Sequence, residues 1–229
     1  MSFILMLGTI LLQPNSNIKL ENNNLTESFE KEIFNNSFEL STDIAQLSLE
    51  MIFEKDFLKE IPIMKTLVSF YNITNSIIAR HNVKKIIVFL QEFHSNKIEN
   101  GKLDKFKAKF NSEQKYKEEV LETILVLIEK FVIIKKSKIL ANLFKSHIEE
   151  KINWEEFQNL SFVLNNLNPA AYTFLINYIE KNKPIKMIDH MEGEALLMAC
   201  GVGSKFEDRF QLHRTGRQLY DFGLKPSNR

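Results

Sequence analysis

Hydrophobic residues recur at intervals of three and four along most of this chain, which is the spacing that lines up one face of an α-helix. Residues 25–35 and 41–53 both follow this spacing, and the polar run at 35–37 interrupts it between them. The hydroxyl and carboxylate side chains at 41–43 are suited to cap the start of the second segment. The pattern therefore predicts two amphipathic helices here.

The densest hydrophobic stretch spans residues 57–93. Pro62 suits the first turn of a helix, where a missing N–H group leaves no helical hydrogen bond unmade. Apolar residues then continue at helical spacing, with a polar break at 80–82 and with Lys84 and Lys85 just after it. We predict a helical hairpin or a kinked helix that turns at 80–82, buries a wide arc and carries both lysines on its other face.

The middle of this stretch is open to two interpretations. Residues 61–79 hold a single charge, at Lys65, and a helix of that length would reach about 28 Å, close to the hydrocarbon thickness of a bilayer. Interspersed Asn, Thr and Ser lower its hydrophobicity, so we expect the central hairpin of a soluble helical core. The alternative is a surface that enters a membrane or contacts a protein partner. The residues of that contact would be Ile63, Leu67, Phe70 and Ile77.

Residues 97–110 are rich in lysine and predict a short basic amphipathic helix after the break at Gly101. We expect a surface helix anchored by Phe106 and Phe110, and contact with phosphate or lipid through the lysines is the alternative. Its lysines at helical positions are Lys102, Lys105, Lys107 and Lys109.

The next part of the chain shows regular helical patterns with clear boundaries. A long helix is predicted over 114–132, and another has its apolar positions at 139–148. Asn153 and Glu156 have the spacing of a capping box, in which each side chain bonds the backbone N–H of the other residue. We therefore expect a helix to start at Asn153, and Pro169 to start the one after it.

The two ends of the chain differ from this helical middle. Residues 3–12 are an apolar block without the basic residues and cleavage site of a secretory signal, and it is shorter than the ~20 residues of a spanning helix. We expect a buried segment there, strand-like or helical, with an exposed partner-binding or membrane-touching segment as the alternative.

Near the other end, residues 192–200 predict a helix that stops at Gly201, followed by a turn or strand at 202–205 and a short strand at 209–212. A last helix is expected over 215–222, with Thr215 as its cap and Gly223 at its C-terminal end. This order, with the turn Leu-His-Arg-Thr-Gly-Arg at 212–217, resembles the closing portion of a winged-helix module. The resemblance implies a two-stranded wing, but the apolar helix at 194–200 lacks base-reading side chains.

These elements together predict a mainly α fold, a multi-helix bundle with a small C-terminal α+β, winged-helix-like appendage. The expected parts are an apolar segment and loop over 1–24, a helical domain over 25–182 and the appendage over 185–229. Composition agrees, since 44% of residues are hydrophobic and only seven glycines and five prolines occur, too few for the many tight turns of an all-β sandwich.

Charge adds one refinement. The net charge of +1 conceals an alternation, because residues 1–79 carry −5, 80–151 carry +6, 152–200 carry −3 and 201–229 carry +3. The basic segments are able to attract phosphate or anionic lipid, or to pair with the acidic ones. The basic residues of the appendage are candidate nucleic-acid contacts. They are Lys205, Arg209, Arg214 and Arg217.

No motif in the chain identifies a reaction. A phosphate-binding glycine loop, a nucleophile elbow and an HExxH metal motif are all missing from the sequence. The only local candidate for a metal is the set Asp189, His190, Glu192 and Glu194, whose spacing does not favour one. We therefore predict no catalytic, cofactor or metal residues. A single cysteine, Cys200, forbids an intrachain disulfide and fits a reducing, cytoplasmic compartment.

The order of the parts, an apolar hairpin after Lys59-Glu60-Ile61-Pro62, then Leu- and Ile-rich helices and a winged-helix-like tail, resembles bacterial helical proteins of defence loci, including abortive-infection α-type proteins. That resemblance implies a part in phage defence. We expect a non-enzymatic interaction or effector protein that contacts a partner, a second copy of itself or a membrane. The alternative is a nucleic-acid-binding protein that uses its basic tail.

Overall fold

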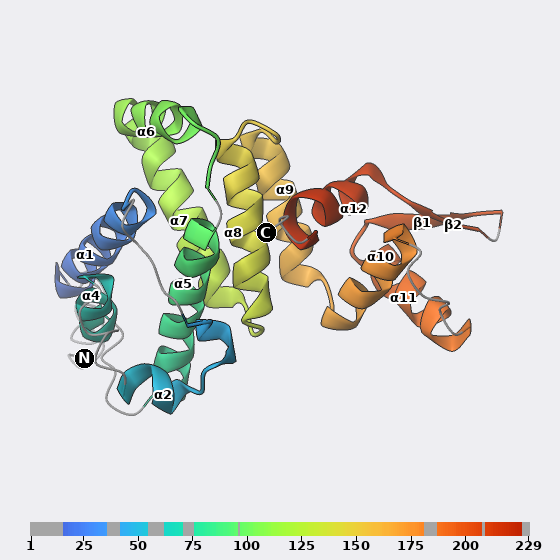
Figure 1. Cartoon of the computed structure of the whole chain (residues 1–229), viewed down its shortest axis with the longest axis horizontal. Helices are drawn as coiled ribbons and strands as arrows, with labels where there is room; N and C mark the ends of the chain where they lie inside the picture. The colour runs from blue at the N-terminus through green and yellow to red at the C-terminus, as the bar shows by residue number, and fades with distance from the viewer. Residues whose placement is uncertain are drawn as a thin grey trace, which may run out of the picture.

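The computed structural model describes residues 16–35, 42–54, 62–70, 76–95, 97–180, 187–207 and 209–225, and this part of the chain is mainly α-helical (Figure 1). Its first half consists of α1 (Ser16–Ile33), the 3-10 helix η1 (Ile44–Gln46), α2 (Leu49–Glu54), α4 (Pro62–Phe70), α5 (Ile77–Ser95), α6 (Lys102–Ser112) and α7 (Gln114–Lys130). Its second half consists of α8 (Lys135–Ile148), α9 (Trp154–Asn166), α10 (Pro169–Glu180), α11 (Met187–Ala199), β1 (Gly203–Phe206), β2 (Arg209–Leu212), α12 (Arg214–Leu219) and the π-helical turn η2 (Tyr220–Leu224). The predicted fold class is confirmed: a helical bundle carries a small two-stranded sheet near its C-terminal end. The apolar block at 3–12 lies outside the described residues.

Helix α5 occupies the centre of the bundle and packs along α8 (Figure 1). All its residues from Asn82 to Leu90 are buried, so that this helix is enclosed on every side. Phe89 and Phe93 pack against Phe144 of α8, with ring centroids 6.3 and 5.7 Å from it. This confirms that the second half of the dense hydrophobic stretch belongs to the core.

Two details of that prediction were wrong. Residues 80–82, where a turn was expected, lie inside the continuous helix α5, which begins at Ile77. Lys84 and Lys85 are buried instead of facing water. Their ammonium groups donate to backbone carbonyl groups that neighbouring segments leave unpaired, Lys84 to Leu47 and Lys85 to Glu129 and Phe131. Helix ends supply such carbonyls, and a lysine can reach them with its long stem.

Helix α4 packs mainly on α1. Its buried residues Ile63, Met64 and Leu67 belong to the same core as Phe29 of α1, and the Ser28 and Thr66 hydroxyl groups lie 2.8 Å apart. The two halves of the predicted hairpin therefore contact different neighbours, α4 on the outer helix and α5 on the central one. No helix within the described ranges is long and apolar enough to cross a membrane.

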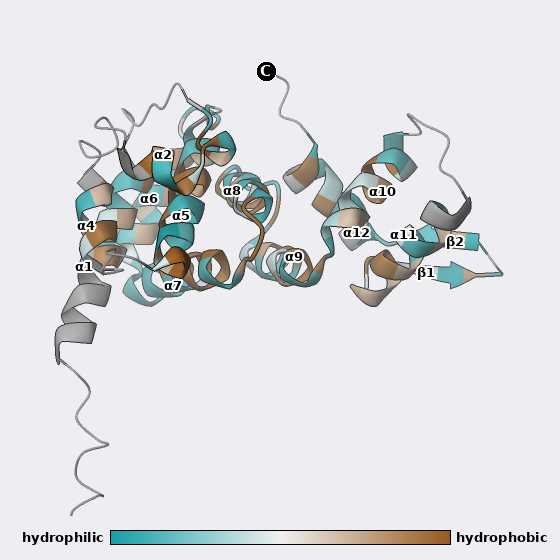
Figure 2. Cartoon of the chain, turned by 90° about the horizontal axis from the view of Figure 1, so that it is seen from below, coloured by the Kyte–Doolittle hydropathy of each residue, from teal (hydrophilic) through white to brown (hydrophobic). Residues whose placement is uncertain are grey.

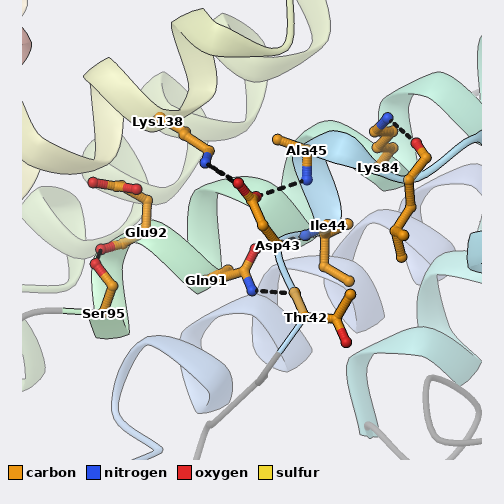
Figure 3. A network of polar contacts seen from close by, with 10 residues as sticks. Thr42, Asp43, Ile44, Ala45, Lys84, Gln91, Glu92, Ser95 and Lys138 are labelled. Atoms are coloured by element: carbon orange, nitrogen blue, oxygen red, sulfur yellow. Dashed lines mark hydrogen bonds and ion pairs between the residues drawn. The ribbon is translucent and has the colours of Figure 1, made fainter.

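Residues 42–47, which lie between α1 and α4 in the sequence, are held by side chains of α5 and α8 (Figure 3). A single helix was expected over 41–53, but η1 and α2 are separate, and this expectation was wrong. The Gln91 side-chain amide pairs with the backbone on both sides of Asp43, because it accepts from Ile44 N at 3.0 Å and donates to Thr42 O at 2.7 Å. Asp43 caps η1 through Ala45 N and pairs with Lys138 of α8. These contacts fix an extended backbone where local pattern alone favours a helix.

The C-terminal part leaves the bundle and returns to it. Helix α10 packs on α11, the ribbon of β1 and β2 follows, and α12 and η2 then lie against α9 and α8. Figures 1 and 2 both place the ribbon at the end of the molecule opposite α1 and α4. Gly223 marks the return: a Cβ atom there would lie 2.8 Å from Cγ2 of Ile139, so only a glycine lets the backbone approach α8 this closely.

Two boundary assignments near this return were also wrong. Gly223 lies inside η2 and does not end a helix, and α12 begins at Arg214, so Thr215 is within its first turn and is not its cap. Gly201, by contrast, follows α11 with a φ of +71°, as expected of a helix-terminating glycine.

Candidate nucleic-acid interface

The ribbon of β1 and β2 is antiparallel, and its register decides which side chains share a face. Ser204 pairs with Gln211, and Phe206 pairs with Arg209. Directly opposed residues of an antiparallel pair lie on the same face, and so do residues two apart along one strand. These four residues therefore share one face, and His213 continues it beyond β2. We call this set, Ser204, Phe206, Arg209, Gln211 and His213, the ribbon face.

The opposite face of the ribbon is packed. Phe210 is buried, its ring lies 5.2 Å from that of Tyr178, and Tyr178 donates its hydroxyl to Phe210 O at 3.1 Å. Gly203 makes room for the Phe210 ring, because a Cβ atom at this glycine would lie 2.3 Å from it. Gly193 of α11 likewise leaves space for Phe174 of α10. One face of the ribbon thus packs on α10 and α11, and the other face is exposed to solvent.

The ribbon face is polar and aromatic, and it has no carboxylate among its five members. Phe206 is 60% exposed, and Arg209 and Gln211 are exposed as well. Within the described ranges Arg209 forms no ion pair. An exposed phenyl ring directly across from an arginine supplies a stacking surface and a cation at one place.

His213 is held by two hydrogen bonds at the base of the ribbon. Its Nδ1 lies 3.2 Å from Gly201 O and donates to it, because a carbonyl can only accept. Its Nε2 lies 2.9 Å from the Ser204 hydroxyl, within hydrogen-bond distance. This second bond connects β1 with the residue that follows β2 and adds a hydrogen-bonding edge beside Gln211.

Lys205 lies on the other face from Arg209, because it pairs with Phe210. Its Nζ lies 3.5 Å from the Glu194 carboxylate, which is itself buried and lies 2.9 Å from Nδ1 of His190. The fold therefore separates Lys205 from the ribbon face and uses it to neutralise a buried acid. Glu194 is one of the four residues considered above as metal ligands, and this contact with Lys205 already occupies its carboxylate. The described residues contain no group of three possible metal ligands.

Arg214 and Arg217 project from α12 beside the ribbon, and both are exposed. Arg214 Nη2 lies 2.7 Å from the carboxylate of Glu156 on α9, the residue that also closes the capping box with Asn153. The pKa of Glu156 is lowered, first by the Asn153 backbone N–H, then by Gln218, with the charge of Arg214 adding to them. Arg214 is thus partly neutralised, whereas Arg217 forms no ion pair among the described residues.

The lysines of α6 all have partners within the protein, so this helix fits the expected surface role. Lys102 and Lys105 both donate to Glu150, and these bonds lower the pKa of its carboxyl to about 2. Lys107 lies over the ring of Phe34 and Lys109 over that of Tyr116. The predicted anchors Phe106 and Phe110 are buried.

The four candidate partner-contact residues of the hydrophobic stretch are not brought together. Ile63 and Leu67 are buried, so a contact through them would need α4 to leave its neighbours. The Phe70 side chain lies outside the described ones. Ile77 is 75% exposed, together with Ile78, at the start of α5. His81, one turn after Ile77, bonds the backbone of exposed Val132, so the apolar patch of Ile77, Ile78 and Val132 borders the loop after α7.

Sequence reasoning singled out Arg209 but missed Phe206, Gln211 and His213. The alternation of residues at 209, 211 and 213 was the available signal, since every second residue of a strand faces the same way. The register that adds Phe206 requires the turn between the strands, whose geometry the sequence does not specify. No protein-family model, curated protein or solved structure matches this chain.

Proposed function

We propose that this chain is a binding protein that contacts nucleic acid through the ribbon face. The observation that carries the proposal is the pair of Phe206 and Arg209 on one face of a ribbon at one end of the molecule (Figure 2). The ring is exposed, and the guanidinium has no ion-pair partner among the described residues. Arg217 is a second exposed cation, on α12, the helix that follows the ribbon. Neutralising phosphates releases counterions, which is the main source of affinity in such contacts.

The remaining members of the ribbon face supply hydrogen bonds. Gln211 offers a donor and an acceptor together, and Ser204 and His213 are hydrogen-bonded to each other next to it. Side chains of this kind hold the sugar–phosphate backbone in register and reach the edges of bases. A two-stranded ribbon is also narrow enough to enter a nucleic-acid groove. The geometry therefore supports contact with both phosphates and bases.

Fluorescence anisotropy with labelled single-stranded and duplex oligonucleotides, measured over a salt series, tests this function. Arg209→Gln should weaken binding several-fold and reduce the slope of log affinity against log salt by about 1, the loss of one phosphate contact. Lys102→Gln is the matched control, because it removes one positive charge at a site already neutralised by Glu150.

Two results would exclude the proposal. One is the absence of salt-dependent binding to either oligonucleotide. The other is an equal loss for Arg209→Gln and Lys102→Gln, which would mean that only the overall charge matters.

The role of an interaction or effector protein in phage defence stays a prediction. The observation that favours a protein contact is the exposure of three apolar residues, Ile77 and Ile78 at the start of α5 and Val132, whose backbone bonds His81 one helical turn after Ile77. Size-exclusion chromatography with light scattering tests self-association through these residues. A concentration-dependent dimer that Ile77→Asp dissociates would support this role, and a monomer at all concentrations would exclude a second copy as the partner.

A further inference from the structure

Packing within the protein does not explain why a phenylalanine occupies position 206. Burying a phenylalanine side chain stabilises a fold, yet this ring is 60% exposed on the outer face of a short ribbon. The inner face of the same ribbon is filled by Phe210, Tyr178 and Phe174. The ribbon is therefore stabilised without Phe206, whose ring is left as a flat apolar surface in solvent.

The neighbours of Phe206 favour a ligand that is both aromatic and anionic. Arg209 lies directly opposite, where the Cβ atoms of paired residues are about 4.5–5.5 Å apart. With the two side chains this close together, the Arg209 guanidinium can bind a phosphate while the Phe206 ring stacks on the base of the same nucleotide. An acidic peptide would use the arginine alone, and an apolar peptide would use the ring alone. A nucleotide uses both.

The exposed ring of Phe206 favours single-stranded over duplex nucleic acid. Bases in a duplex are stacked on each other and show only their edges in the grooves, whereas an unpaired base exposes its face to an aromatic side chain. Stacking of this kind contributes to the affinity for each stacked base and tolerates any base, because every base has a flat aromatic face. The hydrogen-bonding residues Gln211, Ser204 and His213 continue along the same face and would hold the strand beyond the stacked base.

We infer that the ribbon face is a platform for single-stranded nucleic acid, with an unpaired base stacked on Phe206 and its phosphate bound by Arg209. This inference rests on the proposed function and narrows it to one class of substrate. It makes Phe206 the residue that discriminates between single strand and duplex, and Arg209 the residue that contributes to both.

The test compares affinities for a labelled single-stranded 12-nucleotide DNA and for the duplex of the same sequence. Phe206→Leu should weaken single-strand binding about fivefold or more and leave duplex binding nearly unchanged, because leucine is apolar but cannot stack. Phe206→Tyr should keep the single-strand affinity. Phe162→Leu is the matched control, since Phe162 is 68% exposed on α9 and residues 157–166 around it carry no charge.

The outcomes separate the two proposals. If Arg209→Gln weakens binding but Phe206→Leu does not change the ratio of single-strand to duplex affinity, the protein binds nucleic acid and the platform is wrong. If neither oligonucleotide binds in a salt-dependent way, the proposed function itself fails. Loss of affinity in Phe206→Tyr as large as in Phe206→Leu would also overturn the stacking role, because tyrosine retains the ring.

Discussion

The Nζ of Lys85 lies 2.7 Å from the backbone carbonyl oxygen of Phe131, between two residues that are both about 1% exposed. The same ammonium group donates to Glu129 O at 2.8 Å. Both carbonyls belong to the end of α7, where the last turn of a helix leaves acceptors unpaired and carries a partial negative charge. A lysine of the central helix therefore takes the place of a cap for its neighbour.

This contact predicts a stability that depends on pH. Burial lowers the pKa of Lys85 to about 8, against 10.5 for an ordinary lysine, and Glu129 opposes part of this shift. Between these values the unfolded chain binds more protons than the folded one, so the free energy of unfolding rises as the pH goes from 8 to 10.5. The full gain is about 3 kcal/mol.

Urea unfolding at pH 7, 8, 9 and 10 measures the effect. The difference in unfolding free energy between the wild type and Lys85→Met should increase with pH, since methionine has no proton to lose. Lys115→Met, at an exposed position on α7, should give a curve parallel to the wild type. Parallel curves for Lys85→Met as well would contradict the buried ammonium group.

The close approach of η2 to α8 predicts the outcome of a double-mutant cycle. Gly223→Ala should destabilise the fold by about 1–3 kcal/mol, because the new Cβ would lie 2.8 Å from Cγ2 of Ile139 in a packed interface. Ile139→Leu removes that branch of the side chain and should recover a large part of the loss in the double variant. Thermal and urea unfolding of the four proteins give the coupling energy. Strictly additive effects would show that the contact is not the cause.

Glu156 pairs with Arg214, one of the basic residues expected from the sequence to contact nucleic acid, and this predicts a gain of binding when the pair is removed. Glu156→Gln keeps a side chain that can complete the capping box but removes the charge that pairs with Arg214. We expect about a twofold rise in affinity for single-stranded DNA, in line with an exposed ion pair of a few tenths of a kcal/mol. Asn153→Ala is the control, since it removes the cap and keeps the carboxylate. Anisotropy titrations decide the matter, and unchanged affinity in Glu156→Gln would place Arg214 outside the contact.

The two hydrogen bonds of the Gln91 side-chain amide should stabilise the segment before α2. Gln91→Leu should lower the free energy of unfolding by about 1–2 kcal/mol, because the Thr42 carbonyl and the Ile44 N–H lose their partner together. Hydrogen exchange at the Ile44 amide should become faster in this variant. Gln46→Ala, at an exposed position in the same segment, should leave both quantities as they are.

The helical parts could be predicted wherever neighbours along the chain decide the structure. The capping box of Asn153 and Glu156 formed as its spacing indicates, with the Asn153 side chain accepting from Glu156 N at 2.8 Å. Gly201 ends α11, and the two strands of the ribbon lie within a residue of their predicted limits. Each of these features depends on hydrogen bonds or conformations that span only a few residues.

The candidate site was predictable only in part. Arg209 and Phe206 meet because of the register of the ribbon, and a slip of one residue would put either on the packed face. Lys205, which sequence reasoning grouped with Arg209, faces Glu194 instead. Charge along the chain indicates that a segment is basic, but it does not say which cations remain unpaired.

Apolar spacing, caps and helix-ending glycines act locally, so the amino-acid sequence was enough to predict the mainly α class, most helix positions and the ribbon between α11 and α12. The burial of Lys84 and Lys85, the contact of Gly223 with α8 and the shared face of Phe206 and Arg209 depend instead on the packing and pairing of separate segments. Distance along the chain explains the difference. The carbonyl groups that accept from the Lys85 ammonium lie 44 and 46 residues away from it, and no local pattern reports them.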